Sequence, residues 1–312
     1  MSAIDKLFDL VAHLFSKGKT SATPRLITCL IVALCTTLLI TVAVAPIVAV
    51  AVALAGYRFP FPRIFDRTLV VTLFAILLML APRLELFDLL REGFDGPKRG
   101  IWHVFGGFGL SFGAVAALFG MARIAGATLD THIIVVSCVR YLPAAILIAL
   151  IEETFFRAFL LAGLQREIGA CGALLLSSGI YAGVHVIRSP ARFYVVDFEP
   201  RAGAETLAAC AGRLLDVHAV VPMIGLFLLG MVLGQAFIGG RGVYLPLGLH
   251  AGFVMGAKSW RSAVRGVIPR WLAGPGAIPL LAAPAAWALS VTIFAILYLW
   301  SARNEISGRR PS

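Results

Sequence analysis

Two glutamates and an arginine stand inside a long apolar run, in the segment 151–157 (IEETFFR). A charged side chain near the centre of a bilayer costs about 2.5–3.5 kcal/mol on insertion scales, so these groups need a compensating role. On a helix, Glu153 and Arg157 share a face and are expected to pair, while Glu152 points about 100° away and stays available for chemistry. The alternative is a salt bridge at a helix end that snorkels to the headgroups.

Two of the six histidines also lie in apolar stretches, namely His185 and His250. An imidazole there must be hydrogen-bonded, and for either ring alone a neighbouring carbonyl would suffice. If consecutive helices run antiparallel, Glu152 and His185 lie at comparable depth, and His250 is reachable from a later helix. The three side chains are therefore expected to face one cavity. The other histidines lie in or beside polar segments and need no special explanation: His13, His103, His132 and His218.

Such a cavity would suit hydrolysis. A carboxylate kept from bulk water can take a proton from a bound water, and an imidazole can hold that water or protonate the leaving amine. The second histidine could donate to the oxyanion of a tetrahedral intermediate. Glu152, His185 and His250 would equally suit zinc with an open fourth position, although the HExxH pattern is absent. The sequence therefore assigns no cofactor and leaves zinc open.

Three short motifs follow one another in successive apolar segments. The first is EExxxR at Glu152-Glu153 to Arg157, the second is an aromatic residue, Tyr181, four positions before His185, and the third begins at His250. In this order they resemble the CPBP family of intramembrane endopeptidases, also called Abi, which includes the type II CAAX prenyl endopeptidases and lysostaphin-resistance type proteins. The resemblance covers roughly residues 141–256. It implies an endopeptidase that hydrolyses peptide bonds of membrane-associated proteins, CAAX-type or other.

The resemblance also implies roles for the site residues. Glu152 would activate the attacking water together with His185, and His250 would help to stabilise the oxyanion. Glu153 and Arg157 would shape the site, with Arg157 meeting a substrate carboxylate.

The chain departs from the family pattern at two positions. The family usually has Asn four residues after the third-motif histidine, whereas this chain has Val254, which cannot donate a hydrogen bond. Loss of one oxyanion donor costs about 10²–10³ in rate in other enzymes. Ser259, a backbone N–H or a water would have to substitute. Tyr181 in place of the usual Phe is a milder change.

The composition predicts an all-α, polytopic integral membrane protein. The 312 residues are 60% hydrophobic and 14% charged, with a mean hydropathy of +0.92, values that exclude a soluble domain. About eight transmembrane helices are expected to form a single catalytic bundle. Their predicted ranges are 26–55, 64–81, 101–125, 141–164, 169–187, 220–238, 243–257 and 278–300.

The sequence also suggests how the chain is divided. Residues 1–25 would be polar or amphipathic, 26–140 would hold the first transmembrane helices, and 141–257 would be the catalytic core. Residues 258–312 would comprise an interfacial connector, the last span and a polar tail. Within this scheme residues 4–15 and part of 188–218 suit amphipathic surface helices, and 84–99 suits an aqueous or interfacial segment.

The net charge of +11 comes from basic residues scattered among short connecting segments. This distribution favours anionic lipid headgroups as partners and argues against nucleic acid. Alternate segments carry similar numbers of Lys and Arg, so the positive-inside rule assigns no orientation. The expected location is an integral, multi-pass position in the inner or plasma membrane if the source is bacterial. The sequence assigns no oligomeric state.

Two other classes of function compete with hydrolysis. In a proton-coupled transporter, Glu152, Glu153 and the histidines would form a proton relay, but no internal repeat or pair of broken helices supports this. A non-catalytic scaffold or immunity factor would explain the valine at position 254.

Overall fold

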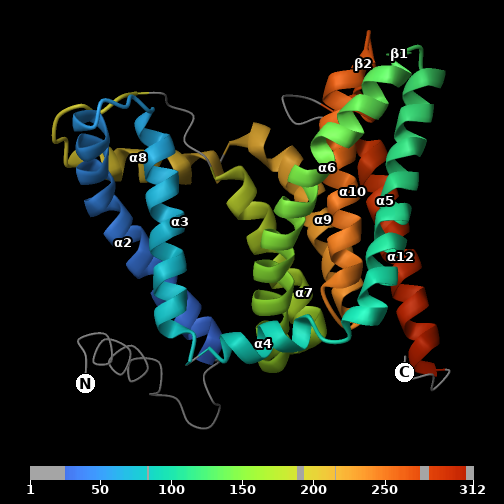
Figure 1. The fold of residues 1–312 in the computed structure, drawn as a ribbon, viewed down its shortest axis with the longest axis horizontal. Helices are drawn as coiled ribbons and strands as arrows, with labels where there is room; N and C mark the ends of the chain where they lie inside the picture. Colours follow the sequence, from blue (N-terminus) through green and yellow to red (C-terminus); the bar gives the residue numbers. More distant parts are fainter. Residues whose placement is uncertain (1–24, 83, 188–192, 215, 275–280, 307–312) are drawn as a thin grey trace. The chain divides into compact units, whose positions relative to one another are not determined.

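The computed structural model describes residues 25–82, 84–187, 193–214, 216–274 and 281–306 (Figure 1). Within these residues one pair of two-residue strands is the only sheet, and all other regular secondary structure is helical, which confirms the all-α prediction. The chain forms two compact units, one from residues 1–87 and 187–216 and the other from residues 88–186 and 217–312. The predicted amphipathic helix at 4–15 lies outside the described residues.

Five stretches of the described chain are long and apolar enough to cross a membrane: Leu26–Leu54, Gly100–Ile124, Thr131–Val186, His218–Gly240 and Pro284–Asn304. The third of these contains two predicted spans, because the backbone of Gly169 leaves the helical region there (φ 74°). The multi-pass architecture is thus confirmed. The count of eight is not confirmed, since α3 (Phe61–Leu80) and α10 (Tyr244–Ala263) are not among the five.

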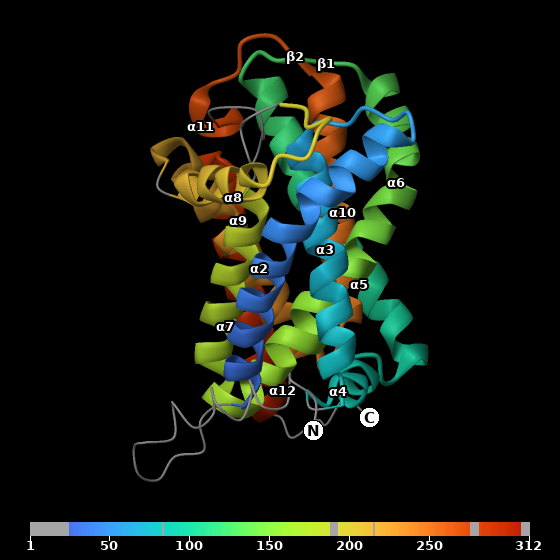
Figure 2. The same cartoon turned by 90° about the vertical axis from the view of Figure 1, so that its left-hand side faces the viewer.

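The first unit consists of α2 (Arg25–Leu54), α3 and α8 (Arg201–Leu214). α2 and α3 pack side by side and α8 lies across them (Figure 2). Ala45 and Ala49 of α2 meet Phe61 and Phe65 of α3 in the core of this unit. α8 confirms that part of 188–218 forms a helix. α3 begins directly after Pro60, with Pro62 in its first turn, where the missing N–H of proline costs nothing.

The second unit is a bundle of long helices, joined at one end by the strand pair (Figure 1). α10 packs against α5, α6 and α9, and α7 packs against α9 and η1. The element that carries His250 is therefore central. The bounds are α4 (Leu86–Gly93, mostly in this unit), α5 (Pro97–Ile124), β1 (Thr128–Leu129), α6 (Thr131–Glu153), η1 (Thr154–Leu161), α7 (Ala162–Val186), α9 (Val217–Gly240), β2 (Val264–Arg265), α11 (Arg270–Ala273) and α12 (Pro284–Ile306).

Several predicted helix boundaries in this unit are wrong. The helix expected at 141–164 begins ten residues earlier, at Thr131, because the Asp130 carboxylate accepts a hydrogen bond from the Ile133 N–H (3.0 Å) and caps it. It also does not stop at Leu164 but continues to the break at Gly169. The last span begins at Pro284 and not at 278. Part of the segment expected to be aqueous or interfacial, 84–99, forms α4.

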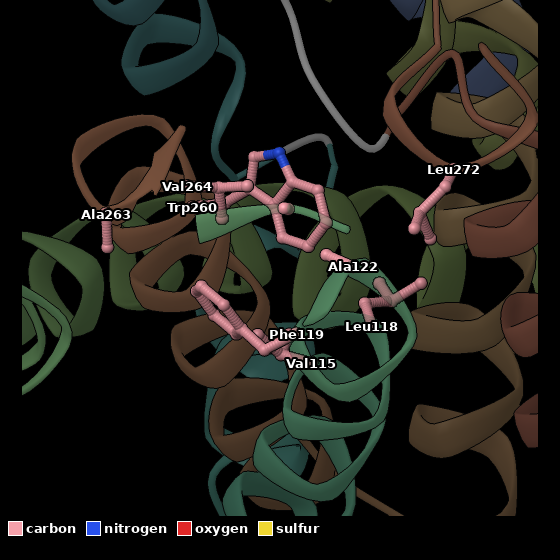
Figure 3. Packing of buried hydrophobic residues seen from close by; sticks show 9 residues of the cluster. Val115, Leu118, Phe119, Ala122, Trp260, Ala263, Val264 and Leu272 are labelled. Atoms are coloured by element: carbon pink, nitrogen blue, oxygen red, sulfur yellow. The ribbon is translucent and has the colours of Figure 1, made fainter. Parts of the chain in front are cut away.

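The helix expected at 243–257 extends to Ala263, so the first residues of the expected connector lie inside α10. Tertiary packing explains this difference. The buried Trp260 ring lies 5.3 Å from the Phe119 ring, centroid to centroid, in an apolar cluster shared by α5, α10, β2 and α11 (Figure 3). The Lys258 ammonium lies 5.6 Å from the centre of the Tyr141 ring on α6. These contacts stabilise about one and a half helical turns beyond the predicted end at residue 257.

Glycines at four-residue intervals bring α10 against α5. A Cβ atom at Gly248 would collide with the Val104 carbonyl oxygen, one at Gly252 with the Ser111 hydroxyl, and one at Gly256 with Val115. Such small residues let two backbones approach closely within a membrane. This approach fixes the position of α10 and hence of His250.

A single methyl group added at Gly248 should weaken the contact between α5 and α10. We expect Gly248→Ala to lower the free energy of unfolding by about 1–3 kcal/mol, because the added methyl must displace backbone atoms. Gly109 lies on α5, and a Cβ atom there would have no neighbour within 4 Å, so Gly109→Ala should be neutral or slightly stabilising through helix propensity. Denaturant unfolding of both variants in detergent measures the difference. Equal stability of the two would contradict a tight helix contact at Gly248.

Candidate active site

Side chains from three helices meet around Glu152, which lies in the last turn of α6. Its Oε2 atom lies 3.3 Å from Nε2 of His185, near the end of α7, and 3.7 Å from Nε2 of His250 on α10. Glu152 and His185 are each about a quarter exposed. The geometry therefore brings together the three side chains that the sequence analysis expected to share a cavity.

Glu153 holds both Arg157 and His250. The Arg157 Nε lies 3.2 Å from Glu153 Oε2, and the His250 Nδ1 lies 2.7 Å from Glu153 Oε1. The exposed fractions of Glu153, Arg157 and His250 are 0%, 3% and 2%. A pair this deeply buried does not snorkel, so the helix-end alternative is wrong. Because a carboxylate only accepts hydrogen bonds, Nδ1 of His250 carries the hydrogen and Nε2 faces Glu152.

The ring of His185 is oriented in a similar way. Its Nδ1 lies 2.8 Å from the carbonyl oxygen of Tyr181, one turn earlier on α7. A carbonyl also only accepts, so Nδ1 donates and the other ring nitrogen, Nε2, faces Glu152. Both histidines thus present the same type of nitrogen atom to one carboxylate.

Both imidazole rings face the same carboxylate oxygen, that of Glu152. If both rings were neutral, each Nε2 would direct a lone pair at the Glu152 oxygen, which is repulsive. With neutral rings the two glutamates and Arg157 would also leave one net negative charge in a largely buried cluster. The cluster therefore places one carboxylate beside two imidazole rings, which are groups that can accept and donate protons.

Tyr181 forms the wall between these groups. Its buried ring lies 4.3 Å from the His185 ring and 6.4 Å from the His250 ring, and the Arg157 guanidinium carbon lies 4.9 Å from the ring centre. Phe156 meets the same ring edge-on at 5.0 Å. The aromatic position of the second motif thus sets the spacing of both histidines and covers the arginine with a π-face.

Two features of the site were not assigned roles from the sequence. The first is η1, a π-helical segment that starts directly after Glu153 and carries Arg157; such wide turns recur at functional sites. The second is Gly230, whose carbonyl accepts a hydrogen bond from Arg157 Nη2 (3.3 Å). A side chain at position 230 would press against Ser178, since a Cβ would lie 3.0 Å from its Cα. No sequence signal identified either feature in advance.

Ser259 does not replace the donor that Val254 lacks. It lies nine residues after His250 on α10, about 13.5 Å farther along the helix axis. Its hydroxyl instead pairs with the Cys138 thiol (3.4 Å). Val254 itself is half-buried, on the same face of α10 as His250. A backbone N–H or a water is therefore left as the substitute for the missing oxyanion donor.

The zinc alternative gains no support from the described part of the chain. There, no group of three or more His, Cys, Asp and Glu side chains is arranged so that it could hold a metal ion.

Residues 134–255 match the family described as Type II CAAX prenyl endopeptidase Rce1-like. This segment is similar to the Rce1-like family. The matched residues include Glu152, Glu153, Arg157, His185 and His250, so the predicted family resemblance is confirmed. Rce1-like proteins are CAAX-type intramembrane proteases in general terms, and the apolar helices agree with an integral, multi-pass protein. No curated protein and no solved structure was found to match the chain.

Proposed function

We propose that this protein is an intramembrane endopeptidase that hydrolyses a peptide bond of a membrane-associated, prenylated CAAX-type protein. The observation that carries the proposal is the approach of one glutamate oxygen, Oε2 of Glu152, to Nε2 of His185 at 3.3 Å and to Nε2 of His250 at 3.7 Å. The substrate class rests on the family description, which names a prenyl endopeptidase.

In the proposed reaction Glu152 and His185 act on the attacking water. The pair takes one proton from the water as its oxygen bonds to the peptide carbonyl carbon, which gives a tetrahedral intermediate. When the C–N bond breaks, the same proton is returned to the leaving amine, so the pair ends in its starting state. The products are a carboxylic acid and an amine, and the acid then gives its proton to the amine or to solvent. Partial burial of Glu152 excludes most bulk water from the reacting groups.

His250 would stabilise the negative charge on the carbonyl oxygen. When protonated, its Nε2–H can donate to the oxyanion, and its Nδ1–H is already held by Glu153. The Glu153 carboxylate balances the imidazolium charge, and Arg157 keeps that carboxylate in place. We therefore assign positioning roles to Glu153 and Arg157. This differs from the expectation that Arg157 meets a substrate carboxylate, since Arg157 is 3% exposed and engaged with Glu153.

Cleavage of a farnesylated CAAX peptide by the purified protein in proteoliposomes tests the proposal. We expect the farnesylated peptide to be cleaved at least about tenfold faster than the same peptide without the lipid, because prenyl burial concentrates the substrate in the bilayer. No cleavage of either peptide, combined with a proton flux that Glu152→Gln abolishes, would point to the transporter class. A cellular phenotype that survives both Glu152→Ala and His185→Ala would point to the scaffold class.

A further inference from the structure

A polar pocket lies where three apolar helices of the second unit end. Its lining comes from the first turns of α5, the end of α9 with the turn that follows, and the end of α12, and its cavity volume is about 50 Å³. In Figure 1 the first turn of α5 and the last turn of α12 lie at the same end of this unit. Three of the five candidate membrane spans terminate within a few residues of the pocket, so it lies at the depth of the lipid headgroups.

The lining residues suit a phosphate group. Arg241 and His103 bring basic nitrogens, and Ser301 and Asn304 bring a hydroxyl and an amide. None of the eight residues that line the pocket is acidic. A guanidinium binds phosphate in a bidentate fashion, and hydroxyl and amide groups add hydrogen-bond donors.

An aromatic ring completes the pocket on its membrane side. Trp300 lines it and meets the His103 ring edge-on, with centroids 6.4 Å apart. Tryptophan is enriched at this depth of a bilayer, where its ring packs beside the glycerol and ester region of lipids. Gly239 allows the close approach of α9 to α12, because a Cβ there would lie 3.2 Å from Ser301 and 3.3 Å from Trp300. The pocket therefore combines donors for an anion with an apolar wall.

The backbone conformation at Arg241 indicates that this side chain has a function. Arg241 has a φ of 53°, in the left-handed region that glycine adopts without strain, and it stands between Gly240 and Gly242. Glycine at position 241 would relieve the strain, so retention of an arginine suggests that its side chain is used. The competing explanation is that the positive charge only complements the C-terminal end of α9.

We propose that this pocket binds the phosphate group of an anionic glycerophospholipid, with the Arg241 guanidinium as its main ligand. His103, Ser301 and Asn304 supply the further polar contacts, and the acyl chains lie along the apolar helices below Trp300. The site is separate from the Glu152 cluster and does not depend on peptidase activity.

Binding of short-chain phosphatidylglycerol to the purified full-length protein in a neutral detergent tests this site. Arg241→Gln should raise the Kd at least about tenfold, since a hydrogen bond to a charged group is lost. Arg303→Gln is the matched control, because Arg303 is exposed at the same end of α12 and does not line the pocket. Its Kd should change by less than about twofold, as expected for a screened surface charge.

A further variant and two competing ligands distinguish specific binding from misfolding, from a general effect of charge and from binding of free phosphate. Arg241→Gly should lose lipid binding while the protein unfolds at the same or a higher temperature, because the strain is relieved. Equal Kd values for Arg241→Gln and the native protein, or equal losses for both arginine variants, would overturn the proposal. Diacylglycerol should not compete. Displacement of the lipid by an equal concentration of inorganic phosphate would overturn a lipid as the source.

Discussion

Replacement of Glu152 by glutamine is expected to reduce peptide cleavage by about 10²–10⁴-fold, the range that loss of a general base produces. The amide cannot take a proton from water, yet it has nearly the shape of the carboxylate. Because Glu152 is 24% exposed and lies outside the buried Glu153–Arg157 pair, the variant should unfold at nearly the native temperature. Initial rates on a farnesylated peptide, measured beside a thermal unfolding curve, check both parts.

Glu92→Gln is the matched control for this experiment. It makes the same chemical change in an exposed glutamate of α4, which pairs with Arg166 at 2.6 Å. An exposed ion pair of this kind contributes only about 0–1 kcal/mol, so both activity and stability should stay close to native. Native turnover in Glu152→Gln would remove the proposed base and with it the hydrolytic function. A loss of activity in both variants would point to a general effect of charge.

Replacement of Arg157 by methionine is expected to lower the free energy of unfolding by about 3–5 kcal/mol. The reason is that the completely buried carboxylate of Glu153 would lose the guanidinium with which it pairs. The variant would also lose the hydrogen bond to the Gly230 carbonyl and the contact with the Tyr181 ring. Denaturant unfolding in detergent measures the change. Arg166→Met removes an arginine from the exposed pair with Glu92 and should cost less than about 1 kcal/mol.

The double variant Glu153→Gln/Arg157→Met tests whether the cost comes from an unbalanced charge. We expect it to recover a large part of the stability lost in Arg157→Met, since no buried charge is then left without a partner. The glutamine oxygen can still accept the His250 Nδ1–H, so His250 stays oriented. A double variant as unstable as Arg157→Met would mean that packing of the arginine side chain dominates. Equal losses for Arg157→Met and Arg166→Met would contradict the buried network altogether.

These variants distinguish a catalytic role of the polar side chains from a purely structural one. Glu152→Gln is expected to affect rate and to spare stability, whereas Arg157→Met is expected to affect stability first. This difference follows from exposure, because a quarter of Glu152 is open whereas Arg157 and Glu153 are almost completely buried. If these polar side chains served only to hold the helices together, both variant proteins would be less stable than the native protein.

The sequence alone determined the helical, membrane-embedded class and singled out the residues of the candidate site. An apolar composition leaves few structures other than helices that satisfy the backbone in a bilayer, so the fold class follows directly. The four-residue spacing of Glu153 and Arg157 is a local property of one helix, and the pair forms as predicted. His185 and His250 were identifiable because polar rings in apolar spans are costly.

Only the tertiary structure decided which partner each group has. Nothing in the local sequence indicates that His250 donates to Glu153 while its other nitrogen faces Glu152, because these contacts join residues almost a hundred positions apart. Long-range packing also explains the helix end at Ala263, where the buried Trp260 overrides the charge pattern. The helix start at Thr131 has a local cause, the cap that Asp130 provides. Long-range packing also directs Ser259 toward Cys138, away from the site.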